Sequence, residues 1–520
     1  MKRVFSIVFA LALVLAFSLV ATTPVAAAVV IPVVPGIGTI AAAVAASNPL
    51  GGDIIQLTAP GLYWEGHITI PWNLTIMGIP GAIIHPAGPL QADGWASSWF
   101  LVSPGVTFVL QDVLMDGTPA FVHQAIRNHG NAIIQNVGFL NIGGAPGSYR
   151  GVGIQSYGGT VSGGAGSDSH GGGGASATLQ VIGCTFSGIG RIGVLVKGTA
   201  STASVSGCTY AGKGAAINCL DYGVEAGAGG TVTVTGNTIT TCTGLASDGS
   251  TSAGILVTTY YGAGTTATIT SNTLTGNTEG IAVGYDASDT STVVAHLNDL
   301  STNTANGIGS TAPTVDGTCN YWGANNGPGS VGSGSGVGVT TNVNYTPWLT
   351  EAYAPTKNVT PTTGGTATFD PDQGSIEDLT AMGPPTPPPA GVTLPYGMFN
   401  FTICCFTGST VTLTITLPGT VPVGTKWYKY NGGAWDALTI GGGGTNVITV
   451  TLTDNNLVHD EDPTVGRIVD QGGPGYGGGA VGWETYPANK VRVLLPWIAL
   501  FAAIMAGVSL LVVRRRRAQS

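Results

Sequence analysis

The stretch "LQVIGCTFSG", residues 179–188, decides the fold because its pattern returns downstream. Each copy has a β-rich alternation, then Cys or Asn, then one residue and an apolar residue. The further copies are ASVSGCTYAG (203–212), VTVTGNTITT (232–241), ATITSNTLTG (267–276) and VVAHLNDLST (293–302). Successive Cys or Asn positions lie 24, 29, 35 and 26 residues apart. A period of about 20 to 30 residues is typical of a solenoid.

A second phrase follows each of the first four copies. It reads IGVLV, YGVEA, AGILV and EGIAV, around Gly193, Gly223, Gly254 and Gly280. Both phrases are rich in β-formers and alternate with period two, which predicts strands. Their fixed order predicts a parallel β-helix, in which the strands of each coil stack on those of the next. Asn after a strand fits this fold, because it tolerates the left-handed conformation and stacked amides hydrogen-bond between coils. A β-sandwich is the alternative, but it does not explain the fixed order.

The two ends of the repeat region resemble right-handed parallel β-helix proteins of the pectin-lyase-like type. A short helix is expected at 40–46, and GGDIIQLTAPGLYWEGHITIPWNLTIMG (51–78) resembles the opening of their first coils. The ending, CNYWGANNGPG (319–329) and then NVNYTPWLT (342–350), is similar to their last coils. The resemblance covers residues 36–350 and implies the fold, whereas the fold alone does not imply a function.

Trp322 and Trp348 belong to that ending. They could be presented to a ligand, or they could cover the last coil. An open sheet edge invites aggregation, and terminal repeats are expected to be atypical caps. We therefore expect the two rings to cover the end of the coil stack.

The composition of the 520 residues narrows the class of protein. There are 83 Gly and only 8% charged residues, and the net charge is -9. Gly is not spaced every third residue, so collagen is excluded. Four of the 17 bases lie together at 514–517, so no basic face remains for nucleic acid.

Both ends of the chain predict export and anchoring. Residues 1–28 have a positive start, an apolar stretch and a small-residue cleavage site, as in a secretory signal peptide. Residues 493–513 are uncharged and would span about 32 Å as a helix, enough to cross a bilayer. The arginines in 514–520 place that end in the cytoplasm. We expect a surface protein held in the cytoplasmic membrane by one C-terminal span.

A different unit precedes the span. Residues 351–363 read as a linker, and 364–475 contain strand patterns without a repeat, which predicts an antiparallel β-sandwich. PYGMF (395–399), WYKY (427–430) and the ending DNNLVHDEDPTVGRIVDQGGPG closely resemble the choice-of-anchor U domain. That resemblance implies a domain placed just ahead of a C-terminal anchor. Residues 476–492 would be the tether, and the tail could be permanent or cleaved by a sorting enzyme.

The seven cysteines cannot all pair within one chain. They have no CxxC spacing, so zinc is not predicted. Several occupy equivalent repeat positions, where small apolar side chains stack in a core. We expect mostly core thiols, with a bridge considered among Cys184, Cys208 and Cys219.

Catalysis on this fold would need two or more carboxylates projecting outward from neighbouring coils. Alignment of the second phrase gives Leu195, Glu225, Leu256 and Ala282 as the outward row, with a single acid. The weak catalytic candidates are Asp221, Glu225 and His170. His170 lies in a glycine-rich loop and equally fits an exposed loop residue.

Aromatic residues suggest a binding surface instead. Four tyrosines fall shortly after the second phrase on different coils and could line one flank: Tyr157, Tyr260, Tyr261 and Tyr285. Exposed aromatic faces can stack on sugar rings. The same rings could equally cover gaps between loops and the barrel wall.

The acidic group Asp460, Asp462 and Asp470 is considered as a Ca²⁺ site, with a solvated acidic turn as the alternative; no other cofactor is expected. The predicted function is a structural, adhesive or polysaccharide-binding protein of the cell surface. Its partners would be extracellular polysaccharide or a neighbouring cell surface. The alternative is an extracellular polysaccharide lyase or glycoside hydrolase.

Overall fold

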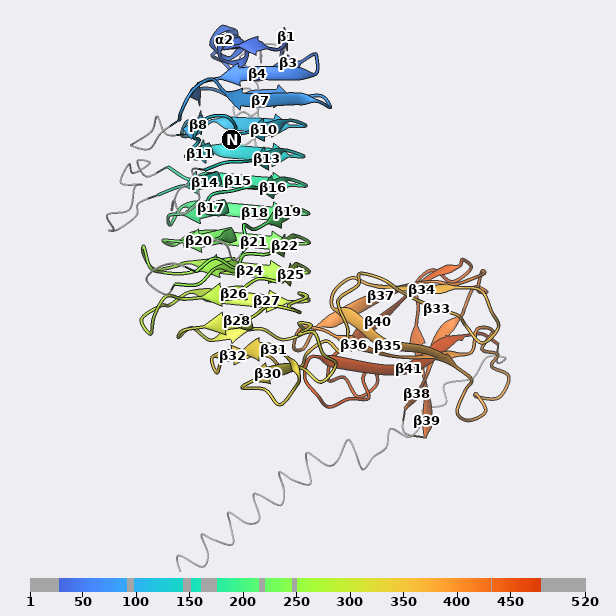
Figure 1. Cartoon of the computed structure of the whole chain (residues 1–520). Helices are drawn as coiled ribbons and strands as arrows, with labels where there is room; N and C mark the ends of the chain where they lie inside the picture. Colours follow the sequence, from blue (N-terminus) through green and yellow to red (C-terminus); the bar gives the residue numbers. More distant parts are fainter. Residues whose placement is uncertain are drawn as a thin grey trace, which may run out of the picture.

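A computed structural model describes residues 28–90, 98–143, 151–159, 175–214, 220–245, 250–431 and 433–477. Figure 1 shows a tall stack of coils with a second β unit beside its C-terminal end. In the described part of the chain, no helix is long and apolar enough to cross a membrane. The predicted signal peptide and the predicted span at 493–513 lie outside the described residues, as do His170 and Cys219.

Three parallel sheets run along the coil stack, and their pairings join strands of neighbouring coils, except for the pair β30–β31 at the end of sheet C, which forms within one coil. Sheet A consists, in spatial order, of β1 (Val30–Val33), β3 (Asp53–Leu57), β6 (Leu74–Met77), β9 (Thr107–Gln111), β12 (Asn131–Gln135), β15 (Ala177–Ile182), β18 (Ser201–Ser206), β21 (Thr231–Thr235), β24 (Thr266–Thr270), β27 (Thr292–His296), β29 (Val315–Asp316) and β32 (Val343–Asn344). Sheet B consists of β2 (Gly36–Ile37), β4 (Gly61–Glu65), β7 (Ala82–Pro86), β10 (Leu114–Asp116), β13 (Gly138–Leu140), β16 (Thr185–Ser187), β19 (Thr209–Ala211), β22 (Thr238–Thr240) and β25 (Thr273–Thr275). Sheet C consists of β5 (Ile68–Ile70), β8 (Ser98–Val102), β11 (Gln124–Asn128), β14 (Val152–Tyr157), β17 (Ile192–Lys197), β20 (Tyr222–Gly227), β23 (Ala253–Val257), β26 (Glu279–Val283), β28 (Asn306–Ser310), β31 (Gly336–Val339) and β30 (Pro328–Ser330).

The first repeated phrase forms the strands of sheets A and B, and the second phrase forms those of sheet C. Along β21 the side chains alternate between exposed Thr and buried Val, so one face of each strand fills the core. The parallel β-helix predicted from the repeats is therefore confirmed as an arrangement of large parallel sheets.

The Cys/Asn position at the turn between sheets A and B forms a buried ladder. The backbone N–H of Asn237 donates to Oδ1 of Asn272 at 2.9 Å, and Asn272 donates likewise to Asn298 at 3.0 Å. The predicted coil-to-coil hydrogen bonding is confirmed. The left-handed residue is not the Asn, however, but the one before it, such as Ser271 with φ 57° or Leu297 with φ 59°. The Asn side chain contacts both neighbouring coils, since Asn272 accepts from Asn237 and donates to Asn298.

The cysteines fit this ladder without the bridge that we considered. Cys184 and Cys208 are buried free thiols, and the Cys184 N–H donates to the Cys208 sulfur at 3.4 Å. The disulfide of the described structure joins Cys319 to Cys404 instead. The two cysteines are 85 residues apart in sequence, so repeat position gave no indication of the pairing.

Both ends of the coil stack are covered. At the N-terminal end lies α2 (Thr39–Ala46), whose first N–H groups, at Ile40 and Ala41, donate to the buried Glu65 carboxylate at 2.6 and 3.2 Å. At the other end Trp322 is fully buried, and a Cβ on Gly307 of β28 would lie 2.8 Å from its ring. The covering role expected for Trp322 is confirmed, while Trp348 is half-buried against Gly327.

The C-terminal unit consists of two antiparallel sheets around a core of its own. One contains β33 (Lys357–Val359), β34 (Ala367–Pro371), β37 (Thr410–Thr416) and β40 (Val447–Thr453). The other contains β35 (Ser375–Met382), β36 (Met398–Cys404), β41 (Arg467–Gly475), β38 (Lys426–Asn431) and β39 (Ala434–Thr439). Buried Phe369, Phe399 and Trp427 lie at the centre of this core.

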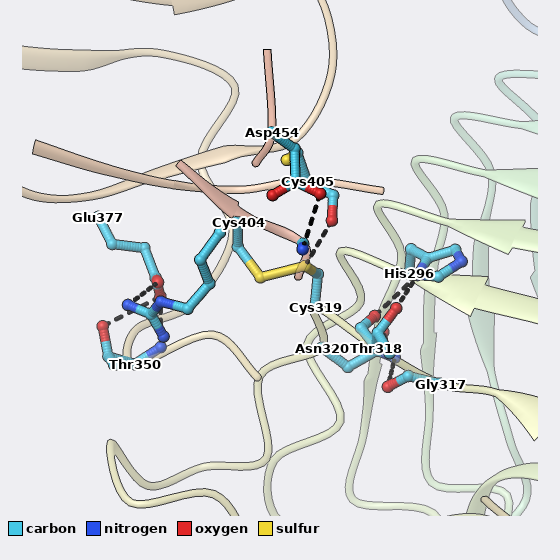
Figure 2. Close-up of a disulfide and its surroundings, with 12 residues drawn as sticks. His296, Gly317, Thr318, Cys319, Asn320, Thr350, Glu377, Cys404, Cys405 and Asp454 are labelled. Carbon is cyan, nitrogen blue, oxygen red and sulfur yellow. Dashed lines mark hydrogen bonds and ion pairs between the residues drawn. A yellow bond between two sulfur atoms is a disulfide. The ribbon is translucent and has the colours of Figure 1, made fainter. Parts of the chain in front are cut away.

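The two units are joined at the end of the β-helix, and Figure 2 shows the junction around the Cys319–Cys404 disulfide. Thr350 donates to the buried Glu377 carboxylate through its N–H at 2.5 Å and its hydroxyl at 3.0 Å. The rings of His296 and Phe406 pack edge to face with centroids 4.6 Å apart. A covalent bond, hydrogen bonds and ring packing therefore hold the C-terminal unit against the last coils.

Candidate functional site

The outer face of sheet C carries two rows of side chains. Register places Leu195, Glu225, Leu256 and Ala282 in one row, as predicted from the sequence. The other row, three residues earlier, contains Ile192, Tyr222, Ala253, Glu279 and Asn306. Both rows face outward because two consecutive residues between them, such as Gly223 and Val224, face the core.

This local irregularity explains why Glu279 was missed. Strict alternation from Ala282 would not place Glu279 outward, yet the glycine of the phrase shifts the alternation by one residue. The signal in the sequence was that Glu279 stands directly before that glycine, in the same place as Tyr222. The outer face therefore presents two glutamates, on β20 and β26, where we expected one acid.

A cavity of about 670 Å³ lies over these rows. Its wall includes both glutamates, apolar Leu220, Leu256 and Ala282, and residues from the loops that follow the sheet C strands. Its charged, amide and aromatic lining residues are Arg191, Tyr222, Glu225, Tyr260, Tyr261, Glu279, Tyr285 and Asn306. We call this cavity the outer groove.

Three of the four predicted tyrosines meet in the outer groove. Tyr260 contacts Tyr261 with ring centroids 4.7 Å apart and contacts Tyr285 at 5.1 Å, both nearly perpendicular. Tyr260 is 60% exposed and Tyr285 is 42% exposed, so both offer ring surface to a ligand. Their coils are neighbours in sheet C, so their loops end side by side.

Tyr157 does not belong to this group. It is only 4% exposed, and its ring packs edge to face on His129, with centroids 5.7 Å apart. The expectation of an exposed ring at this position is wrong. Tyr157 is the last residue of β14 and is covered, whereas Tyr260 and Tyr285 lie in loops beyond their strands.

Arg191, Glu225 and Tyr261 form the charged part of the outer groove. Burial alone would lower the pKa of Arg191, but the Glu225 carboxylate and the Tyr261 and Tyr222 phenols outweigh it and raise that pKa. Arg191 also donates a hydrogen bond to Tyr261. Burial, reinforced by the Glu225 charge, raises the pKa of Tyr261, so its hydroxyl stays protonated at neutral pH. Arg191 is not among the site residues predicted from the sequence.

Lys197 contributes a second cation beside the same ring. Its Nζ lies 3.8 Å from the centroid of the Tyr261 ring, and the residue is 8% exposed. A cation over a tyrosine face is stabilised by the quadrupole of the ring. Tyr261 therefore lies between a lysine and an arginine, which fixes its orientation at the wall of the outer groove.

Glu279 is the group of the outer groove that titrates near neutrality. Burial raises its pKa to about 7, although a hydrogen bond from Asn306 opposes that rise. The Asn306 Nδ2 donates to its Oε1 at 3.0 Å. A carboxyl group with this pKa can hold or release a proton at neutral pH, which is what general acid–base chemistry needs.

Asp221 is adjacent in sequence to the outer groove but does not line it. Its carboxylate is fully buried and accepts hydrogen bonds from the Tyr210 hydroxyl at 2.5 Å and the Lys213 N–H at 2.6 Å. Burial raises the pKa of Asp221. Its partners give it a structural role within the coil, so the pairing of Asp221 with Glu225 as joint catalytic acids is not supported. His170 lies outside the described residues.

The acidic residues of the C-terminal unit do not form the Ca²⁺ site that we considered. Asp470 is fully buried and forms an ion pair with Lys429 at 3.1 Å, and Asp460 accepts backbone N–H bonds from Asn455 and Val469. Asp462 caps the N–H of Thr464. No group of three or more His, Cys, Asp or Glu that could hold a metal ion occurs in the part of the chain that the structure describes.

No protein-family model matches the chain, and no curated protein matches it. Among solved structures it is similar to AlyGC, a PL6 family alginate lyase, with 17% sequence identity and a TM-score of 0.38. For a mutant of the same lyase the sequence identity is 15% and the TM-score is 0.34. Each match covers 62% of this chain but only 40% of the lyase chain, so the likeness spans less than half of the lyase. A likeness this weak carries no argument about the function of this chain.

Proposed function

We propose that this is an exported cell-surface protein that binds a polysaccharide chain in the outer groove. One observation carries the proposal: three tyrosines from loops of neighbouring coils converge on a cavity of about 670 Å³ whose wall also holds Arg191, Glu225 and Glu279. Aromatic faces offer apolar contact to the C–H faces of sugar rings, while charged and amide groups hydrogen-bond to their hydroxyls.

Export and anchoring rest on separate features. The predicted signal peptide, the predicted span at 493–513 and the resemblance to the choice-of-anchor U domain all favour a tethered surface protein. The Cys319–Cys404 disulfide agrees, because disulfides persist in oxidising compartments outside the cytosol. Protease added to intact cells should cleave the protein, and an unexposed product would overturn this part of the proposal.

Binding is tested with the full chain, purified in mild detergent, by affinity electrophoresis through gels that contain a panel of neutral and acidic polysaccharides. We expect retardation in at least one gel. Replacing Tyr260 or Tyr285 by Ala should weaken that retention about tenfold, because a ring contact contributes about 0.5–1.5 kcal/mol beyond its burial.

Tyr430→Ala is the matched control, since Tyr430 packs on Trp435 in the C-terminal unit, away from the outer groove. It should leave retention unchanged. Retention that is as strong in both groove variants as in the wild type would remove the tyrosines from the binding surface. No retention by any polysaccharide would remove the proposed function.

A second candidate function is polysaccharide cleavage by a lyase or hydrolase. The observation that favours it is the pKa of about 7 at Glu279 in a groove that also holds Glu225. The test is release of reducing ends, for either reaction, and of unsaturated uronate products, for a lyase. Turnover lost in Glu225→Gln or Glu279→Gln, without loss of thermal stability, would favour an enzyme over a binding protein.

A further inference from the structure

We propose that the outer groove selects a neutral polysaccharide, recognised through its hydroxyl groups, and disfavours polymers of uronic acids. This inference rests on the proposed function, since it names the class of polysaccharide that the groove would take. It follows from the hydrogen-bonding groups that the described residues leave unsatisfied in the wall of the groove.

Two carboxylate oxygens in that wall lack hydrogen-bond donors. Oε2 of Glu225 and Oε2 of Glu279 are both buried and have no hydrogen-bond partner among the described residues. Glu225 is 2% exposed. A buried acceptor left unsatisfied costs about 1–3 kcal/mol, and more when it is charged. A ligand that brings donors to these two atoms would recover that free energy.

One donor in the same wall also lacks an acceptor. The Nε of Arg191 is buried without a hydrogen-bond partner, although the guanidinium interacts with Glu225 and Tyr261. The unsatisfied set in the outer groove therefore contains two acceptors and one donor. A sugar hydroxyl can both donate and accept, so neighbouring hydroxyls of one sugar chain can satisfy both kinds of group.

A uronate carboxylate meets only half of this requirement. It accepts hydrogen bonds but has none to donate, so it would suit Arg191. At a pH where Glu279 is also ionised, it would face the oxygens of Glu225 and Glu279 without a proton between them. The cations of the site are already engaged, Arg191 with Glu225 and Tyr261, and Lys197 with the Tyr261 ring. Placing a further anion there brings like charges together in a partly buried site, which is how binding sites reject a partner.

The rest of the wall agrees with a ligand that carries no charge. Leu256, on the strand between those of the two glutamates, and Ala282 present apolar surface, and Tyr260 and Tyr285 present aromatic faces. These surfaces match the C–H faces of pyranose rings and add no cation. The inference also bears on the second candidate function, cleavage by a lyase or a hydrolase. A lyase works by β-elimination, which needs a carboxylate beside the C–H that loses its proton. A neutral substrate would therefore leave hydrolysis as the reaction.

The experiment compares each acidic polymer with its own carboxyl-reduced form, using the full chain in affinity electrophoresis. Polygalacturonate and alginate, together with their carboxyl-reduced products, give pairs that differ only at C6, where a neutral hydroxymethyl group replaces the carboxylate. Neutral glucans and mannans complete the panel. We expect the polysaccharides that retain the protein to be uncharged, and a reduced form to bind at least about tenfold more tightly than its acidic parent. Raising the salt concentration should leave that retention unchanged, because screening acts on charges.

Glu225→Gln and Glu279→Gln test the two acceptors. Each keeps the size of the side chain and removes its charge, so each should weaken retention by the neutral polymer and strengthen retention by the acidic one. A loss of structure would weaken both. Glu351→Gln is the control, because Glu351 is exposed and pairs with Lys357 outside the outer groove.

Two results would overturn the inference in distinguishable ways. Tighter binding of the acidic member of each pair would overturn the neutral class while leaving polysaccharide binding intact. Absence of retention by every polymer would overturn the proposed function and the inference with it.

Discussion

At the scale of single residues, burial and neighbouring charges change the pKa values of side chains in the outer groove. Glu279 is the clearest case, because burial raises its pKa to about 7 while Asn306 holds one of its oxygens. Tyr261 lies between Lys197 and Arg191 and keeps its proton. Each of these side chains is oriented by a neighbour from another coil.

The raised pKa of Glu279 predicts a pH dependence of stability. The folded state holds the proton more tightly than the unfolded chain, where the ordinary value is 4.5, so its contribution to stability is fully present below about pH 4.5. That contribution is lost as the pH rises through about 7. Glu279→Gln mimics the protonated form, so its melting temperature should match the wild type at pH 4.5 and exceed it by at least about 2 °C at pH 8.

Differential scanning fluorimetry across this pH range measures the difference between variant and wild type, which cancels the other titrating groups. Glu351→Gln, on an exposed side chain, should give no pH-dependent difference. Equal pH profiles for Glu279→Gln and wild type would show that ionisation of this residue is not linked to folding.

At the scale of elements, the strands are held in register by inward ladders as well as by sheet hydrogen bonds. Asn272 accepts the N–H of Asn237 and donates its own amide to Val234 and Asn298 at 2.9 Å. The ladder thus connects successive turns between sheets A and B through side chains that water cannot reach.

Asn272→Ala should therefore destabilise the β-helix by about 2–4 kcal/mol, because it leaves the buried Asn237 N–H without its partner and removes the side-chain bonds to Val234 and Asn298. Urea unfolding followed by circular dichroism gives the change in the midpoint. Asn358→Ala removes an exposed amide that bonds only to the Thr368 hydroxyl in the described structure, and it should change the midpoint little. A comparable midpoint shift in both variants would contradict the ladder's contribution.

At the scale of the whole molecule, the β-helix and the C-terminal unit are fastened at one end of the coil stack (Figure 1). The disulfide lies in a small apolar cluster with Leu297 and Leu349, and Glu377 contacts Thr350 beside it. This junction sets the direction in which the outer groove faces relative to the C-terminal unit.

Replacing both Cys319 and Cys404 by Ser should loosen the junction. The disulfide closes a long loop of the chain. Because it restricts the unfolded chain, such a bond contributes up to about 4 kcal/mol to the free energy of unfolding. We expect two separate melting transitions where the wild type gives a more cooperative one, and faster proteolysis near residue 350. Reductant should change the melting of the wild type but not of the double variant, and a wild type insensitive to reductant would contradict a stabilising role.

The sequence by itself determined the repeating architecture, because a solenoid is built from contacts between neighbouring repeats. The phrase at 179–188 and its copies predicted the sheets, the Asn ladder and the outward row with Glu225. The covering role of Trp322 also followed, since it depends only on the position after the last copy. Each of these features is local to one coil or to a pair of adjacent coils.

Only the tertiary structure decided which side chains meet. It joined Cys319 to Cys404, buried Tyr157, paired Asp470 with Lys429, and brought Arg191, Glu279 and three tyrosines to one cavity. These contacts depend on the paths of the loops between coils. They also depend on the glycine that interrupts the alternation of side chains in sheet C, which a period-two pattern does not predict. The physical reason is that strand register repeats from coil to coil and can be inferred from one repeat. The burial and the electrostatic environment of a site depend instead on residues that are far apart in sequence.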